Sequence, residues 1–310
     1  MHWFKNIMVY RLSKKLEWTT QVLDASLPNL AFYPCGSHDQ SKFGWAKPLR
    51  GSDLLYFNVN GQILLLAQKE EKILPAHVVK QELDQRIESV EEKEQRKLSK
   101  VEKQTLKDDV VNELLPRAFS KKQQTALWID SANDLIYINA ASAKRAEDGL
   151  ALLRKSLGSL PVIPLAFAND PAAVMTDWIA NDTLPPWLTA LEEAELTSTT
   201  DEAVIRCKQQ ALDSDEMQNH FSAGKQITKL ALEWEEHLSF VFAQDCSLKR
   251  LKFADTIREQ TDDILKEDYA QRFDADFILM TGILAQLSER LLEAFGGESP
   301  SLPEKVAAPV

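Results

Sequence analysis

Few side chains in this sequence could do chemistry, and none of them completes a catalytic or metal-binding motif. The stretch AGKQIT at 223–228 contains the Gly-Lys pair of a phosphate-binding loop, but the earlier glycine of that motif falls at Asn219. Cys35 and His38 are spaced to share a metal ion, but structural zinc needs four ligands and no second pair lies nearby. We therefore interpret both as ordinary loop residues and predict no enzyme, no metal site and no cofactor.

Basic residues give a sharper signal, first in the polar segment that follows Pro75. This segment lacks Gly and Pro until Pro116, and its composition favours one long helix at 75–115 that projects as an arm. On a continuous helix its cations form one stripe with the acidic residues on the opposite side. Such a stripe can contact a phosphate backbone, and the alternative is a solvated helix with internal salt bridges. The stripe consists of Lys93, Arg96, Lys97, Lys100, Lys103 and Lys107, opposite Glu91, Glu94, Glu102 and Asp109.

Two predicted strands of the C-terminal third carry further cations. Lys225 and Lys229 lie four residues apart, so regular alternation places them on one face of their strand. Arg250 and Lys252 likewise share a face of a later strand. If the two strands pair, these four cations lie on neighbouring strands, and the unknown register decides whether they share one face.

The segment LLPRAFSKKQQ at 114–124 carries Arg117, Lys121 and Lys122 and no acidic residue. Its Phe119 has two interpretations that the sequence leaves open. It is either an aromatic residue buried at a dimer interface or a core residue of its own subunit, because aromatic side chains serve both roles.

Composition limits the class of protein. The formal net charge of -11 over 310 residues argues against a surface that coats nucleic acid everywhere, but it permits a basic groove or hole inside an acidic exterior. Cys35, Cys207 and Cys246 are far apart and odd in number, which indicates reduced thiols in a cytosolic protein. No apolar run approaches the roughly 18 residues of a membrane span, so we expect a cytoplasmic protein without membrane contact.

The pattern of elements predicts an α+β fold with mixed sheets, flanking helices and the projecting arm. We expect a central region at 1–74 and 119–170, the arm at 75–118, a C-terminal base region at 171–297 and a disordered tail at 298–310. The predicted strands are 3–12, 54–59, 62–68, 125–130, 135–139, 194–198, 203–208, 226–234, 237–243 and 247–253. The predicted helices, apart from the arm, are 17–26, 142–157, 214–223 and 274–295, and 171–187 is an irregular connection.

Several stretches together resemble the RdgC family of bacterial recombination-associated proteins. They run in family order over about residues 1–297, and only the tail is unmatched. Among them are WFKNIMVYRL, GQILLLAQKEEKILPAHVVKQEL, LLPRAFSKKQQTALWID, SLKRLKFADTIREQ and YAQRFDADFILMTGILAQL.

The resemblance implies an assembly and an activity that periodicity cannot supply. It implies a ring-shaped homodimer with a positively lined hole that admits duplex DNA. It also implies binding to double- and single-stranded DNA without sequence preference, association with the nucleoid, restraint of the RecA recombinase, and no catalysis. The alternatives are a DNA-processing nuclease, for which a metal-carboxylate motif is missing, and a protein-only scaffold that acts directly on the recombinase.

We accordingly predict Phe119 as a dimer-interface residue and ten basic residues as DNA contacts. The ten are Lys97, Lys100, Lys103, Arg117, Lys121, Lys122, Lys225, Lys229, Arg250 and Lys252.

Overall fold

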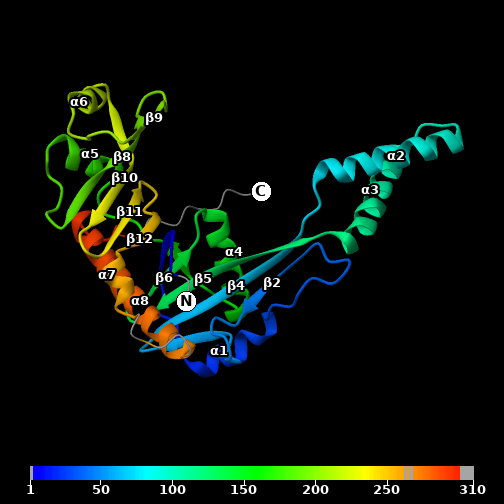
Figure 1. The fold of residues 1–310 in the computed structure, drawn as a ribbon, viewed down its shortest axis with the longest axis horizontal. Helices are drawn as coiled ribbons and strands as arrows, with labels where there is room; N and C mark the ends of the chain where they lie inside the picture. The colour runs from blue at the N-terminus through cyan, green and yellow to red at the C-terminus, as the bar shows by residue number, and fades with distance from the viewer. Residues whose placement is uncertain (1–2, 262–263, 265–267, 301–310) are drawn as a thin grey trace.

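The computed structural model describes residues 3–261, 264 and 268–300, which form one large antiparallel sheet, flanking helices and a projecting arm (Figure 1). The predicted α+β class is confirmed. The mixed sheets that we expected are instead a single twelve-stranded sheet in which all the described strands pair antiparallel.

The elements have the following bounds. The strands are β1 (Ile7–Leu12), β2 (Ser41–Ala46), β3 (Tyr56–Val59), β4 (Gln62–Lys72), β5 (Ser120–Asp130), β6 (Leu135–Asn139), β7 (Val162–Pro164), β8 (Leu188–Ser198), β9 (Val204–Lys208), β10 (Lys225–Trp234), β11 (Leu238–Ala243) and β12 (Leu248–Phe253). The helices are α1 (Thr20–Ser26), α2 (Ala76–Glu94), α3 (Lys100–Leu114), α4 (Ala143–Leu157), α5 (Pro171–Ala180), α6 (Asp215–Ser222), α7 (Asp255–Glu259) and α8 (Tyr269–Ala294). Short 3-10 turns lie at Pro28–Leu30 and Leu115–Arg117.

The strand order is β2-β4-β5-β6-β1-β12-β11-β10-β8-β9, with β3 on β4 and β7 on β1. The predicted hairpin at Asn60-Gly61 is confirmed, and both turn residues have the positive φ that a tight two-residue turn requires. β5 begins at Ser120 rather than at 125. Its first five residues are exposed and polar, so they show no alternation, but they pair with β4 out to Lys72.

Hydrophobic side chains pack on both faces of the sheet. In β5, Trp128 belongs to one core cluster, whereas Leu127 and Ile129 belong to the other. Helix α8 packs in the first cluster, where its Phe273 and Phe277 meet Phe57 with ring centroids 5.0 and 5.5 Å apart. Helices α1 and α4 pack in the second cluster. The strands from the N-terminal half of the chain therefore form a middle layer that is covered on both faces.

The connection at 171–187 is more regular than predicted, because its first ten residues form α5. Pro171 occupies the first turn, where a missing N–H costs nothing, and the Asp170 side chain accepts a hydrogen bond from Ala173 N. Met175 and Trp178 are buried on the face that packs into the core. The prediction of an irregular segment was therefore wrong for its first ten residues, because Pro171 starts a helix there.

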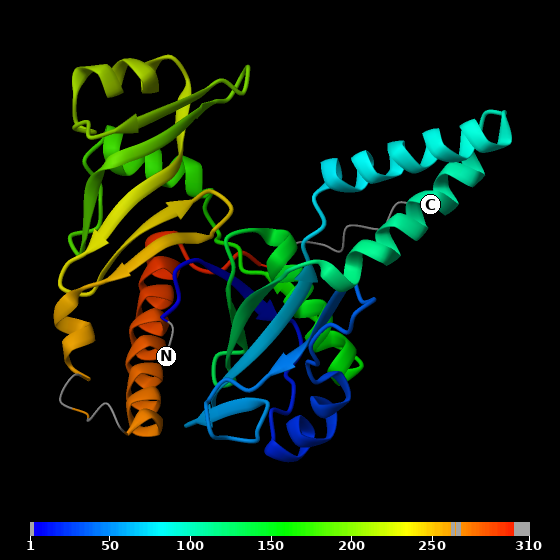
Figure 2. The same ribbon diagram turned by 45° about the vertical axis from the view of Figure 1, so that its right-hand side comes forward.

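The arm is a pair of helices and not the single helix that we predicted (Figure 2). Gln95 ends α2 in the left-handed region at φ 52°. Ser99 and Glu102 then form a capping box, in which each side chain bonds the other residue's backbone N–H, and α3 begins. Folding back buries Leu98 and Val110, which one extended helix would leave in water.

Candidate nucleic-acid interface

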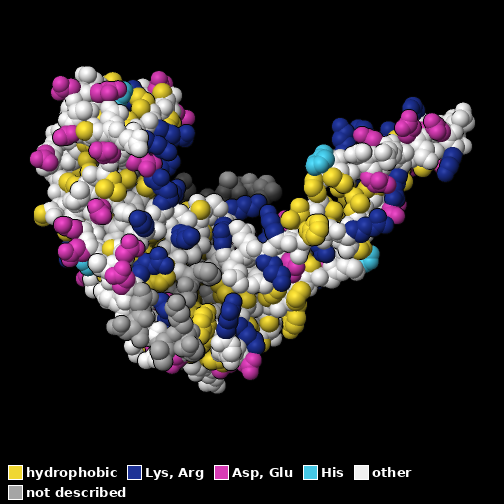
Figure 3. All heavy atoms as spheres, viewed as in Figure 1, with side chains coloured by type: hydrophobic (Ala, Val, Ile, Leu, Met, Phe, Trp, Pro, Cys, Tyr) yellow, Lys and Arg dark blue, Asp and Glu magenta, His cyan; other side chains and the backbone are white. Residues whose placement is uncertain are grey.

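The molecule is a crescent with the arm at one end and the α6–β9 region at the other (Figure 1). In the space-filling view, Lys and Arg side chains gather along the inner edge of the lobe that carries β8–β12 and across the floor of the crescent (Figure 3). Asp and Glu side chains are prominent on the outer edge of the same lobe. Because phosphate responds to local field and not to net charge, the concave side is the candidate nucleic-acid interface.

Within the lobe, helices α5 and α8 lie on the outer side of the strands (Figure 1). The opposite side of β8–β12, which we call the inner sheet face, carries six cations with carboxylates among them. Its cations are Arg206, Lys208, Lys229, Lys249, Arg250 and Lys252, and its carboxylates include Glu192, Glu193 and Glu195. Two adjoining surface cavities of about 690 and 430 Å³ open on it.

Lys225 does not belong to this face, and the prediction that it shares a face with Lys229 was wrong. Ile227 pairs with Leu196, but Lys229 already pairs with Glu195, so β10 carries one extra residue at this point. The bulge reverses the alternation, as the buried positions Ile227 and Leu230 show. Lys225 therefore keeps the phase of Ile227, whereas Lys229 points to the other face.

Arg250 and Lys252 line the same cavity, although β11 separates their strand from β10. Arg250 has a positive φ of 53° within a register irregularity between β11 and β12. This bulge brings Arg250 beside Lys229 in the second cavity. Three of the four predicted strand cations are thus brought together.

Sequence reasoning missed Arg206, Lys208 and Lys249. Arg206 and Lys208 flank the buried Cys207, so alternation along β9 places both on the face opposite the core. The alternation is present in the sequence VIRCK, which lies within the predicted strand 203–208.

Several cations of the inner sheet face form ion pairs with carboxylates of the same face. Glu195 accepts hydrogen bonds from Arg206 Nε at 2.7 Å and Lys229 Nζ at 2.6 Å, and Glu193 lies 2.8 Å from Arg250. Partial burial acts to raise the pKa of Glu195, but the bonds from Lys229 and Arg206 outweigh it and the pKa is lowered. Lys208 and Lys252 form no ion pair among the residues that the structure describes.

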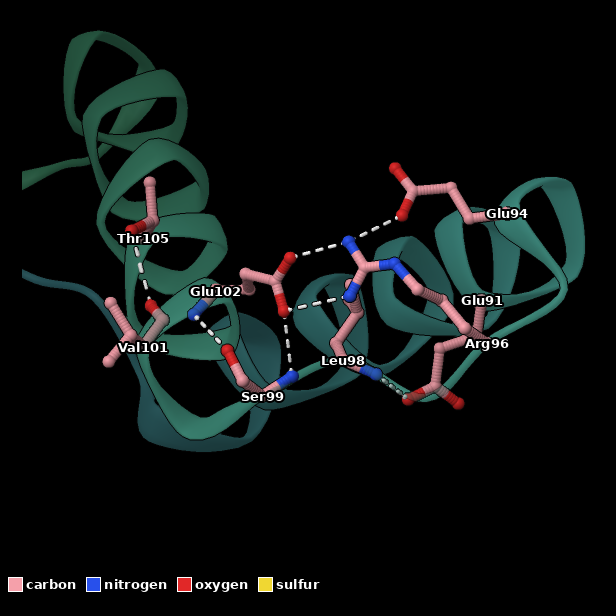
Figure 4. Close-up of polar contacts among 8 residues, drawn as sticks. All are labelled: Glu91, Glu94, Arg96, Leu98, Ser99, Val101, Glu102 and Thr105. Carbon is pink, nitrogen blue, oxygen red and sulfur yellow. Dashed lines mark hydrogen bonds and ion pairs between the residues drawn. The ribbon is translucent and has the colours of Figure 1, made fainter.

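The predicted basic stripe of the arm does not form, because the acidic residues lie among the cations instead of opposite them. Lys97 Nζ is 2.6 Å from Glu91, and Lys103 Nζ is 3.5 Å from the same carboxylate. Arg96 bridges Glu94 and Glu102 (Figure 4). Lys100 is exposed at the first turn of α3.

These carboxylates hold the turn of the arm together. Glu91 accepts the backbone N–H of Leu98, and Glu102 accepts that of Ser99 (Figure 4). A hydrogen bond from Lys97 lowers the pKa of Glu91 to about 2, and one from Arg96 lowers the pKa of Glu102 to about 2. The salt-bridged interpretation of the arm therefore describes Lys97 and Lys103 better than a phosphate stripe does.

At the base of the arm, Phe119 is 86% exposed, so the interpretation of it as a core residue of its own chain was wrong. Arg117 is exposed in the 3-10 turn before it. Lys121 and Lys122 are consecutive in β5 and thus point to opposite faces of the strand, Lys121 toward Glu71 at 3.8 Å. The corner is accessible, but its two lysines do not form one patch.

No group of three or more His, Cys, Asp or Glu side chains is arranged to hold a metal ion in the described part of the chain. Cys35, Cys207 and Cys246 are free. Across residues 3–261, 264 and 268–300, no helix has the length and apolar character that spanning a membrane requires.

The sequence was compared with known proteins. A family model described as "Putative exonuclease, RdgC" matches residues 2–298. "Recombination-associated protein RdgC" of Pasteurella multocida (strain Pm70) is 67% identical over 302 residues, which cover 97% of this chain and 100% of that protein. Proteins of the same name from Haemophilus influenzae (strain PittGG) and Actinobacillus pleuropneumoniae serotype 3 are 67% and 56% identical, over 97% and 96% of this chain and 100% and 98% of their own lengths. The chain therefore belongs to the RdgC family of recombination-associated proteins.

Proposed function

We propose that this protein binds double- and single-stranded DNA through the concave side of the crescent, without preference for sequence. The observation that carries the proposal is the uneven charge of an acidic chain, with Lys and Arg gathered along the inner edge of the lobe and Asp and Glu prominent on its outer edge (Figure 3). Cations on an open sheet face can contact phosphates, which carry no sequence information. Affinity without base readout depends mainly on released counterions and is weakened by salt.

The protein acts as a ring-shaped homodimer in this proposal, with the DNA in a hole between two concave sides. An 86% exposed phenylalanine at the base of the arm supports it, because such an aromatic side chain is a candidate anchor for a second copy. One crescent leaves DNA open to one side, whereas two facing crescents surround it. A ring on DNA also obstructs other proteins that need the same strand.

The names of the relatives place them in recombination. We propose that this chain restrains RecA by occupying DNA, so that the recombinase filament forms or exchanges strands less readily. Binding to chromosomal DNA would place it on the nucleoid in the cytoplasm.

The test is a DNA-binding titration over a range of salt concentrations, combined with a mass measurement of the free protein. We expect log affinity to fall linearly with log salt, equal affinity for unrelated duplex sequences, and the mass of a dimer. A flat salt plot, or strong preference for one duplex among random competitors, would overturn sequence-independent phosphate binding. The mass of a monomer at all working concentrations would overturn the ring.

A nuclease is the second candidate, and the word exonuclease in the family description favours it. The protein incubated with magnesium and end-labelled single- and double-stranded DNA separates the two. We expect intact DNA throughout. Cleavage that copurifies with the protein and disappears on substitution of one carboxylate would replace our proposal, and absence of DNA binding at low salt would favour a protein-only scaffold.

A further inference from the structure

The inner sheet face holds carboxylates directly beside the cations that are proposed to meet DNA. Glu195 bridges Arg206 and Lys229 at 2.7 and 2.6 Å, and Glu193 lies 2.8 Å from Arg250. Three of the six cations of this face thus already have an anionic partner supplied by β8. A phosphate that approaches them must compete with that partner.

These carboxylates differ from those of the arm in what they hold. In the arm, Glu91 and Glu102 also accept backbone N–H groups, so they are part of the turn itself. The carboxylate of Glu195 accepts hydrogen bonds only from the two cationic side chains among the described residues, while its backbone carbonyl accepts one from the Thr228 hydroxyl. Its strand is held independently by the ladders to β9 and β10. Its ion pairs are therefore not needed to shape the backbone around it.

Burial also separates Glu195 from an ordinary surface carboxylate. Its side chain is only 17% exposed, whereas that of Arg206 is 72% exposed. The carboxylate is fixed on the floor of the face while the guanidinium stands above it. The cation can turn toward an incoming phosphate, but the negative charge stays below.

We propose that Glu193 and Glu195 act as internal competitors of DNA phosphate, which reduce the affinity of the inner sheet face and so limit how long the protein stays on DNA. The inference rests on the proposed DNA binding of this face. The side chains of Arg206 and Arg250 are mostly exposed, and water weakens ion pairs of exposed cations, so phosphate can displace the carboxylates. Each displacement nevertheless offsets part of the gain from the new contact. A DNA-binding protein without sequence preference remains mobile when its phosphate contacts are weakened in this manner.

The experiment is a DNA titration with Glu195→Gln, which keeps the shape of the side chain and removes its charge. The probe is a fluorescent random-sequence duplex, measured over a range of salt concentrations. We expect about fivefold tighter binding at constant salt, because two modest ion pairs no longer compete. We also expect the log-log salt slope to become steeper by about one to two, because Arg206 and Lys229 then neutralise phosphate more fully. Glu193→Gln should act in the same direction with a smaller effect, since it releases Arg250 alone.

Glu233→Gln is the matched control. Glu233 lies on the same strand face as Lys229 and forms no ion pair among the described residues. Its substitution by Gln removes the same unit of charge as Glu195→Gln does. If Glu195→Gln and Glu233→Gln tighten binding equally, overall charge explains the effect and the inference is wrong. Weaker binding by Glu195→Gln would show that Glu195 positions the cations, which also overturns it. If the wild-type protein binds no DNA at low salt, the proposed function fails first and the inference falls with it.

Discussion

Glu91 and Lys97 face each other across the turn of the arm, with the carboxylate 2.6 Å from Nζ. Glu91 also accepts the backbone N–H of Leu98, so one side chain joins α2 to the residues that lead into α3 (Figure 4). The arm thus depends on charged side chains at its end and on Leu98 and Val110 beneath them.

Lowering the pH should loosen this turn. Glu91 and Glu102 both have a pKa of about 2 in the folded chain, below the value of about 4.3 for an unperturbed Glu. Their contribution to stability is therefore fully present above about pH 5 and is lost as the pH falls through about 2. NMR chemical shifts of residues 76–114, followed during acidification, should lose their helical character between about pH 5 and pH 2 and should stay unchanged above about pH 5.

Glu91→Gln should loosen the turn at neutral pH. We expect faster amide exchange at residues 95–99, because the substitution weakens the acceptor for both Lys97 and Leu98. Glu88→Gln is the control, since Glu88 is exposed in the same helix and forms no ion pair among the described residues. Equal exchange in both variants would contradict the role assigned to Glu91.

Phe119→Ala should weaken dimer formation and leave the monomer folded. A side chain that is 86% exposed contributes little to the core of its own chain, whereas truncating an anchoring aromatic commonly costs on the order of 2 kcal/mol of association. Sedimentation over a dilution series measures the loss, and thermal unfolding checks the fold. Tyr33→Ala, which removes another exposed aromatic, is the control. An unfolded monomer, or an unchanged dimer, would contradict the interface assignment.

Reversing the two lysines of β5 one at a time should have unequal effects on DNA binding. Lys121 and Lys122 point to opposite faces of the strand, so only one of them can face the concave side. We expect one of Lys121→Glu and Lys122→Glu to lower affinity and to make the salt slope shallower by about one, and the other to change little. Equal losses in both variants would show that DNA contacts both faces of the strand.

Trp128→Ala should destabilise the whole chain. Trp128 is fully buried, stacks on Tyr137 with ring centroids 3.9 Å apart, and donates its indole N–H to Gln62. Replacing a buried Trp by Ala typically lowers the free energy of unfolding by about 3–5 kcal/mol, which denaturant unfolding measures. Trp128→Phe should cost less because it keeps a ring on Tyr137. A loss below about 0.5 kcal/mol for the alanine variant would place Trp128 among ordinary surface positions.

Sequence predicted the elements whose signals are local. Asn60-Gly61 fixes a hairpin through two positive φ angles, and Gly158 ends α4 at φ 80°. The break at Gln95 was not predicted, because its cause is tertiary: Leu98 and Val110 become buried only when the helices fold together. The Ser99–Glu102 capping box then starts α3, and neither residue was predicted to begin a helix.

The candidate interface was predicted less well than the fold. Lys229, Arg250 and Lys252 do gather, but two bulges decide which side chains join them, and a bulge leaves no mark on an alternating sequence. The sequence also did not predict which carboxylate pairs with which cation. Glu195 lies 34 positions from Lys229, and only the register of β8 on β10 brings them together.

The first half of β5 borders the sheet, since β6 pairs only with Leu127–Asp130 among the described strands. A polypeptide edge of this kind can recruit strands from other chains and start aggregation. Two devices oppose this here. Lys121 and Lys122 put charge on the edge, and the Arg145 guanidinium of α4 reaches over to the Gln124 carbonyl and the Thr125 hydroxyl. Lys121 and Lys122 are thus expected to protect this edge against pairing with another chain, a role separate from any contact with DNA.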